Sequence, residues 1–168
     1  MKPPVLLSKD LSPRAARRFG RAWVALAFAL ALHVTDEALT DFLSVYNPTV
    51  HALRDRMPWL PLPTFSFPVW IAGLAAGIAL LLLLSPLAFR GTKWITIVAV
   101  PFSILMTGNA LLHLGSSIYF GRFMPGVNSS PLLLAASLFA LLSALGLRKS
   151  VGQPIQPEAT PASAAGDR

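Results

Sequence analysis

Four long apolar segments, separated by basic or proline-rich stretches, dominate this sequence. They cover about residues 22–42, 69–89, 94–117 and 131–147. Each is long enough to cross a bilayer as a helix, which takes about 17–25 residues. The chain of 168 residues is 54% hydrophobic and only 12% charged, with a mean hydropathy of +0.61, whereas soluble domains carry about 25% charged residues. We therefore predict an all-α polytopic membrane protein, a bundle of four transmembrane helices.

Three further segments surround these spans. Residues 1–21 form a basic N-terminal segment, in which Ser12-Pro13 suits the N-cap and first position of a helix. Residues 47–68 form the main loop, with a short helix expected from Asn47 to Met57 before a proline-rich stretch. Residues 150–168 are rich in Pro, Ala, Gly and Ser and are predicted to be a disordered tail. The sequence thus predicts one transmembrane domain, 22–147, with polar segments at both ends.

The basic residues predict the orientation of the spans. Eleven of them flank the N-terminal side of the bundle, and three lie in the loops of the other side. The eleven are Lys2, Lys9, Arg14, Arg17, Arg18, Arg21, Arg90, Lys93, Arg148, Lys149 and Arg168; the three are Arg54, Arg56 and Arg122. Because cytoplasmic loops carry the excess of Lys and Arg, we predict a multi-pass protein of the cell inner membrane with both termini in the cytoplasm.

The rival interpretation is a secretory signal peptide over residues 1–31. Ala29-x-Ala31 could be its cleavage site, and Arg17-Arg18 is a weak twin-arginine match. However, alanines occur all along this stretch and no helix breaker precedes the pair. We therefore prefer an uncleaved first span.

Net charge and composition limit the classes of binding partner and of site that this chain can have. The net charge is +7, but the basic residues cluster at the ends of apolar segments, where they meet anionic lipid head groups. We expect the lipid bilayer as the partner and no nucleic acid, since the spans leave no surface for a groove-reading element. The chain has no cysteine, which excludes disulfides, thiolate catalysis, Fe–S clusters and Cys-type zinc sites.

Ionisable residues inside the first span form the main candidate site. His33, Asp36 and Glu37 fall within five residues of an otherwise apolar segment, and charged groups in hydrocarbon cost at least ~2.5–3.5 kcal/mol each on insertion scales. On a helix, His33 shares a face with Glu37 four residues later. Asp41, nearer the end of the span, is interpreted as an interfacial acid. Residues this costly indicate a functional site within the membrane.

The third span adds Asn109 and His113, again four residues apart. Counted from Trp23 and Trp94 at ~1.5 Å per residue, Glu37 and Asn109 lie ~21–22 Å deep, and Asp41 and His113 ~27–29 Å deep. His33 lies shallower by ~13–14 Å than His113 on the same count, which argues against one ion bound by both histidines. Pro101 is expected to kink this span.

Glycine, proline and serine indicate local packing. Gly73 and Gly77 form a GxxxG match in the second span, which permits close approach of another helix. Pro125-Gly126 precedes the last span and is expected to close the outer mouth of the site. Ser129 and Ser130 are better explained as helix caps than as nucleophiles.

The motif His33-x-x-Asp36-Glu37, followed by Asn109-x-x-x-His113 and Pro125-Gly126, resembles the HXXEE-domain family of bacterial integral membrane proteins. The likeness covers roughly residues 20–147. Asp36 departs from the glutamate of the family name, which keeps the charge but shortens the reach. The family has no settled activity, so the resemblance implies architecture and site residues more than function.

Several functions fit these residues. His33, Glu37 and His113, with Asp36 or Asn109 nearby as ligand-binding residues, offer the nitrogen and oxygen donors that suit Zn or Fe. Without a metal, the same three side chains could perform acid–base catalysis on a lipid or other apolar substrate, with Asn109 holding its hydroxyl or carbonyl. A non-enzymatic small-ligand binder, transporter subunit or proton relay is the alternative. The simplest interpretation is that these polar residues only hold the helices together.

Overall fold

The computed structural model describes residues 13–152, which form six helices. Four helical stretches are long and apolar enough to cross a membrane. They are α1 (Pro13–Leu39), α3 (Phe67–Leu83) continued by α4 (Ser85–Phe89), α5 (Lys93–Phe120) and α6 (Ser130–Gly152). The described part of the chain contains no strand. The prediction of an all-α bundle of four apolar helices is confirmed.

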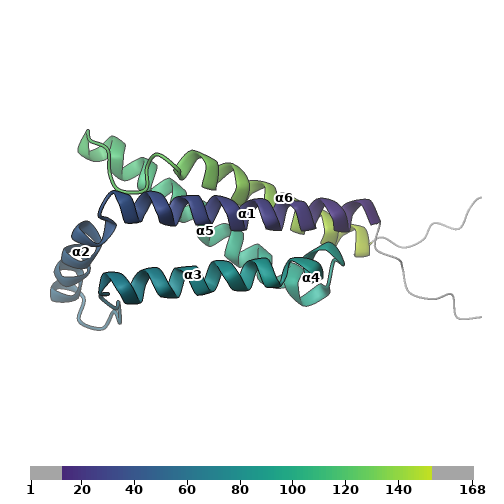
Figure 1. Ribbon diagram of the computed structural model, residues 1–168, viewed down its shortest axis with the longest axis horizontal. Helices are drawn as coiled ribbons and strands as arrows, with labels where there is room; N and C mark the ends of the chain where they lie inside the picture. The colour runs from purple at the N-terminus through teal and green to yellow at the C-terminus, as the bar shows by residue number, and fades with distance from the viewer. Residues whose placement is uncertain (1–12, 153–168) are drawn as a thin grey trace, which may run out of the picture.

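Helix α1 is the centre of the bundle. It packs against α6 on one side and against α3 and α4 on the other, while α5 packs against α6 (Figure 1). Gly20 lets α4 approach α1 closely, because a Cβ at this position would lie 2.8 Å from the Cα of Phe89. Helix α2 (Phe42–Arg56) lies across one end of the bundle (Figure 1).

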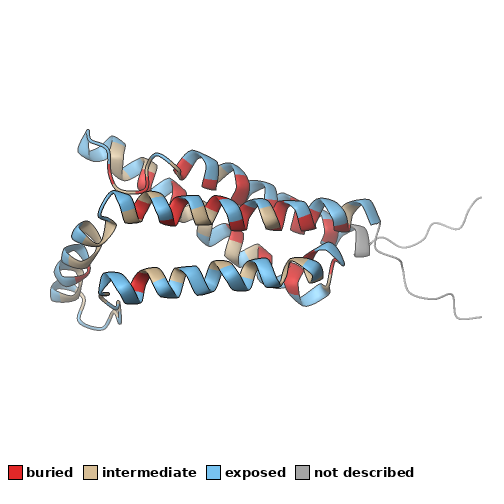
Figure 2. Cartoon of the chain, in the orientation of Figure 1, coloured by how far each residue is buried: buried red, intermediate tan, exposed pale blue. Residues whose placement is uncertain are grey.

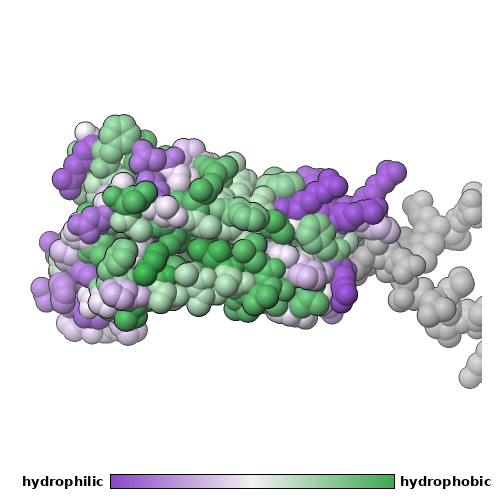
Figure 3. Space-filling model, viewed as in Figure 1, coloured by the Kyte–Doolittle hydropathy of each residue, from purple (hydrophilic) through white to green (hydrophobic). Residues whose placement is uncertain are grey.

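Two apolar clusters hold the helices together. The first, called here the apolar cluster, comprises Phe19, Trp23, Ala88, Ile95, Ala99, Ala144 and Leu147. The second is built around Leu26, Ala110 and Leu133 nearer the middle. Figure 2 shows the buried residues concentrated along α1, whereas α3 is exposed over nearly its whole length. In Figure 3 a broad apolar band separates two polar ends, as expected of a chain that spans a bilayer.

The helix bounds differ from the predicted spans mainly at α1 and α2. Helix α1 begins at Pro13, the predicted first position of a helix, and continues without a break into the predicted span, with Phe19 fully buried on its packed face. It ends at Leu39, where Asp41 adopts a left-handed conformation (φ 55°) and α2 starts at once. The loop helix therefore begins at Phe42, five residues before the predicted Asn47. The predicted cap Ser12 and the tail beyond Gly152 lie outside the described residues.

Two further expectations concern Pro101 in α5 and the suggested cleavage site in α1. Helix α5 continues through Pro101 without interruption. Helix α1 passes unbroken through Ala29 and Ala31, the suggested cleavage site, and the residues before it include Phe19 and Trp23 of the apolar cluster. Cleavage there would remove this packing from the bundle.

Candidate metal centre

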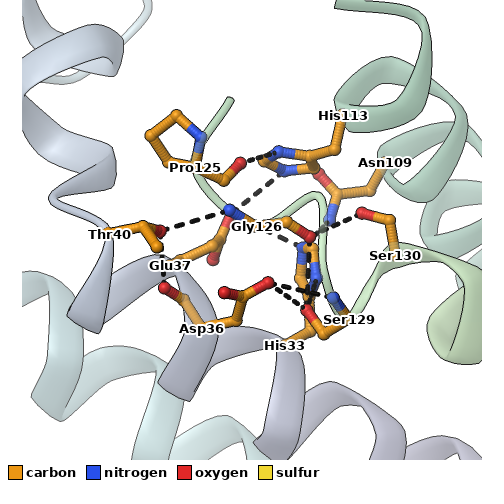
Figure 4. Close-up of polar contacts among 10 residues, drawn as sticks. All are labelled: His33, Asp36, Glu37, Thr40, Asn109, His113, Pro125, Gly126, Ser129 and Ser130. Atoms are coloured by element: carbon orange, nitrogen blue, oxygen red, sulfur yellow. Dashed lines mark hydrogen bonds and ion pairs between the residues drawn. The ribbon is translucent and has the colours of Figure 1, made fainter. Parts of the chain in front are cut away.

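The polar residues of the first and third spans meet near the end of the bundle at which α2 lies (Figure 4). His33 and Glu37 are one turn apart on α1, and Asn109 and His113 are one turn apart on α5. The side chains are deeply placed: His33 is 0% exposed, Glu37 5% and His113 8%. The structure thus brings together the residues that the sequence singled out.

The two histidines are level, so the predicted depth difference between them is wrong. Their ring centroids lie 4.8 Å apart in an edge-on arrangement. The depth count failed because its reference points are not level: Trp23 is buried and donates to the carbonyl of Leu81, whereas Trp94 is half-exposed at the second position of α5. Counted from the helix starts, each histidine stands twenty residues beyond the first residue, Pro13 or Lys93.

The pairing of residues across the two helices changes accordingly. Asn109 Nδ2 lies 3.1 Å from His33 Nε2, and Glu37 Oε1 lies 3.1 Å from His113 Nε2. The depth count had instead matched Glu37 with Asn109 and Asp41 with His113. Asp41 is exposed at the turn between α1 and α2 and takes no part in the cluster.

The hydrogen bonds of His113 fix which of its ring nitrogens carries a proton. Its Nδ1 lies 2.5 Å from the carbonyl oxygen of Pro125. Since a carbonyl oxygen only accepts, Nδ1 is the donor. In the neutral ring, Nε2 then has a free lone pair, and this lone pair faces Glu37.

The same argument applies to His33 through Ser129. The hydroxyl of Ser129 lies 2.9 Å from Asp36 Oδ2 and 2.9 Å from His33 Nδ1. A carboxylate accepts more strongly than a neutral ring nitrogen, so the hydroxyl donates to Asp36 and accepts from Nδ1–H of His33. The lone pair of the neutral His33 ring is therefore on Nε2, which lies 3.6 Å from Glu37 Oε1.

Three lone-pair donors thus converge on one point. The Nε2 atoms of both histidines face the same carboxylate oxygen of Glu37, at 3.6 and 3.1 Å. Lone pairs facing each other in a buried place repel unless a proton or a cation lies among them. At His33 Nε2 the Asn109 amide N–H supplies such a proton, so the closest unrelieved contact is that of His113 Nε2 with Glu37. Two imidazoles and a carboxylate are a donor set that proteins use for Zn and for non-haem Fe.

The distances fit a metal ion. Metal–ligand bonds of about 2.0–2.2 Å in a tetrahedral arrangement separate neighbouring ligand atoms by about 3.3 Å. The two histidine–glutamate distances, 3.1 and 3.6 Å, lie on either side of this value. One ligand atom from each of the three residues falls within 4.8 Å of the others. The widest pair would have to move closer together for both atoms to bind one ion.

The segment before α6 covers this cluster. Gly126, with φ +81°, packs so closely that a Cβ at this position would lie 3.0 Å from Glu37 Cγ and from His113 Nδ1. Its N–H donates to Thr40 Oγ1, and its carbonyl accepts from the hydroxyl of Ser130. The expectation that Pro125-Gly126 lies over the site agrees with this geometry.

Asp36 flanks the cluster rather than joining it. Its carboxylate accepts from the Ser129 N–H and hydroxyl and from the Asn128 side chain, at 3.0, 2.9 and 3.1 Å. These groups immediately precede α6, so Asp36 ties the end of α1 to the start of the last helix. It is joined to His33 by hydrogen bonds through Ser129.

Sequence reasoning missed the part that Ser129 plays at this site. It interpreted this serine as a helix cap, and the contact with His33 needs tertiary structure to be seen. One signal was available: in an antiparallel bundle, the start of the last span lies level with the end of the first. The polar run Asn128-Ser129-Ser130 is therefore expected at the same level as the His33 motif.

Comparison with known proteins finds no matching protein-family model, no similar curated protein and no similar solved structure. The resemblance to the HXXEE-domain family therefore stays a prediction.

Proposed function

We propose that His33, Glu37 and His113 bind one divalent transition-metal ion, Zn or Fe, and that this centre acts on a lipid or another apolar substrate. The observation behind the proposal is the convergence of two histidine Nε2 atoms on one oxygen of Glu37. Each ring is held with its Nδ1 as the donor, which leaves Nε2 unprotonated. The Nε2 of His33 accepts from the Asn109 amide, which would have to release it for a metal to bind. Metal-binding histidines in proteins are oriented by such hydrogen bonds.

The remaining polar residues then have separate roles. Asp36, acting through Ser129, keeps the proton of His33 on Nδ1. The carbonyl of Pro125 does the same for His113. Asn109, whose amide lies 3.1 Å from His33 Nε2, would turn toward a hydroxyl or carbonyl oxygen of a substrate at the open side of the ion.

A divalent ion held by two imidazoles and a carboxylate activates water or polarises a substrate oxygen. The chain itself supplies burial, which excludes bulk water and strengthens electrostatic interactions at the site. It also supplies a carboxylate, Glu37, within reach of both rings. This combination suits chemistry on a polar bond of a membrane-embedded molecule.

The orientation belongs to the same proposal. With the basic end, which bears Arg14, Arg17, Arg90, Lys93 and Arg148, in the cytoplasm of a cell with an inner membrane, the centre lies in the outer half of the bilayer. Reporter fusions after Gly152 and in the 57–66 loop test this arrangement. Activity of a periplasmic reporter at Gly152 would reverse it.

A second candidate function uses the same residues without a metal. His113 Nε2 and Glu37 Oε1 are 3.1 Å apart, which is within hydrogen-bond reach, so a single proton could bridge them. The pair would then exchange a proton with a bound lipid, or pass it on as a relay. The two functions differ in what lies among the three side chains, which is a metal ion in the first and a proton in the second.

Metal content of the purified full chain in lipid nanodiscs tests the proposal. After equilibration with Zn²⁺ and gel filtration, we expect one zinc per wild-type chain by elemental analysis. His33→Ala and His113→Ala should retain less than a tenth of it, because each removes one of three ligands. His51→Ala is the matched control, since His51 is exposed on α2, outside the cluster. Protein purified without added metal shows whether zinc or iron is the natural ion.

A folding readout keeps this test decisive. Helix content and the thermal midpoint are measured on each variant, and Co²⁺ replaces Zn²⁺ in a second series to report coordination by its visible absorption. A folded His113→Ala variant that still holds one zinc would overturn the metal centre. Wild-type protein that holds no metal would leave the proton-exchange function as the better account.

A further inference from the structure

A groove with aromatic walls lies beside the candidate centre. It encloses about 290 Å³ between α2, the start of α3 and the loop that joins them. Its lining includes Phe42, Tyr46, Phe65, Trp70, Gly73 and Leu74. None of the lining residues is charged.

The walls of the groove are held in place by stacking and hydrogen bonds. Phe42 stacks on Tyr46 and on Trp70, with ring centroids 5.4 and 5.9 Å apart. The side chain of Asn47 binds both the N–H and the carbonyl of Phe65, at 3.1 and 2.9 Å. The hydroxyl of Tyr46 donates to the carbonyl of Pro63. The groove therefore presents apolar ring surfaces, and the polar atom of its tyrosine is already paired.

Gly73 keeps the groove open. A Cβ added at this position would meet nothing within 4 Å. The same holds for Gly77, one turn further along α3, and both glycines are exposed. Within the chain, the GxxxG pair therefore packs against no other helix. At Gly73 the missing side chain instead leaves space in the groove.

Phe42 connects the groove with the candidate centre. Its ring lines the groove, and its centroid also lies 5.8 Å from that of His113. A rotation of this one side chain would join the groove to the His113 ring. No other contact described at the centre reaches a lining residue of the groove.

The position of the groove in the bundle indicates what fills it. Val69, Trp70, Gly73 and Leu74 belong to the first two turns of α3, and only 6% of the apolar stretch of this helix is buried. In a membrane, the surroundings of such a helix are lipid chains. Aromatic residues at a span's end mark the level of the head groups. A peptide or sugar in this groove would leave its hydrogen-bonding groups unpaired.

We propose that the groove binds the acyl chain of a membrane lipid and presents the junction between its chain and head group to His113, past Phe42. The part concerning His113 rests on the proposed function. It narrows the substrate class to lipids that carry a polar bond, such as an ester or amide, at the upper end of an acyl chain. Binding of the chain itself needs no metal.

Two glycine variants test the proposal with a matched control. Gly73→Leu fills the groove, whereas Gly77→Leu adds the same side chain to the same exposed helix outside the lining. The probe is phosphatidylcholine with a diazirine in one acyl chain, incorporated in nanodiscs at a low fraction. After illumination, cross-linked peptides are mapped by mass spectrometry.

We expect labelling of the peptides that contain Phe42, Tyr46 and Phe65 in the wild-type protein and in Gly77→Leu, and at least fivefold less in Gly73→Leu. Equal labelling in the two leucine variants would overturn the groove site, because it would show only general contact with lipid. Absence of label at these peptides in wild type would overturn it too. Zinc content, measured on the same samples, should be the same in Gly73→Leu as in the wild-type protein. If the wild-type protein bound no zinc but was labelled at the groove, the metal centre would be contradicted and the lipid site would stand.

Discussion

The two ends of this bundle are held together in different ways. At the basic end, Phe19, Trp23 and Ile95 are almost completely buried, and a side-chain hydrogen bond joins Trp23 of α1 to the Leu81 carbonyl of α3. At the other end, His33, Asp36 and Glu37 bind side chains and backbone from α5 and from the segment before α6. The apolar end shows that these helices associate mainly through apolar packing.

This difference bears on the alternative that the polar residues only hold the helices together. Interhelical hydrogen bonds in membranes contribute only about 0.6 kcal/mol each on average, because polar groups find other partners in the unfolded state as well. Apolar packing already joins α1 to α4, α5 and α6. The ionisable residues at the other end are therefore more than the bundle needs for association, and changes at the two ends should have separable effects.

The largest effect is expected for Gly126→Ala. The new Cβ would lie 3.0 Å from atoms of Glu37 and His113. The alanine would also have to keep the positive φ of Gly126, which costs about 1–2 kcal/mol. We expect metal affinity to fall about 10–100-fold, as it does when groups around a metal ligand are disturbed. Zinc titration of the full chain measures this.

Gly121→Ala is the matched control for that variant. Gly121 also has a positive φ, +61°, but its Cβ would meet nothing within 4 Å. It should lose similar stability while binding zinc normally. Equal zinc affinity in the two variants would show that Gly126 does not shape the centre.

Phe19→Ala tests the apolar end. Lipid chains are as apolar as phenylalanine, so the loss comes mainly from the cavity left behind, about 2 kcal/mol. Unfolding in mixed detergent should show this loss, and the zinc content of the folded fraction should stay at the wild-type level. A drop in zinc per folded chain would mean that the two ends are coupled.

Asp36→Asn should have the smallest effect of the three. The amide keeps an oxygen that can accept from Ser129, but loses the charge that favours the hydroxyl pointing toward it. We expect about tenfold weaker zinc binding, since His33 is then held less firmly in the metal-binding tautomer. Asp55→Asn on α2, outside the cluster, is the control. Unchanged affinity in Asp36→Asn would limit Asp36 to joining α1 and α6.

Much of the architecture was predictable from the sequence because membrane spans depend on segment length and composition. The choice of His33, Glu37, Asn109 and His113 was also within reach, since ionisable and amide side chains are conspicuous in an apolar helix. Their pairing was not. It depends on the relative shift of α1 and α5 along their axes, and this shift is set by packing of residues such as Phe19 and Ile95.

Two local conformations could not be predicted from the sequence either. The left-handed turn at Asp41 starts α2 five residues early and so places Phe42 against His113. Gly73 and Gly77 form a motif associated with helix contacts, yet its first glycine opens a groove. In both cases the neighbours that decide the outcome come from distant parts of the chain.

The bond between His33 and Ser129 has a consequence for biosynthesis. The two residues are 96 positions apart in the chain, and a ribosome adds about 5–20 residues per second. His33, Asp36 and Glu37 thus leave the ribosome several seconds, and up to about 20 s, before the segment that pairs with them exists. During this interval the first helix carries its acidic side chains without their final partners. Ser129 immediately precedes α6, so a chain interrupted before this segment would carry the three ligands of α1 and α5 without the hydrogen bond that orients His33.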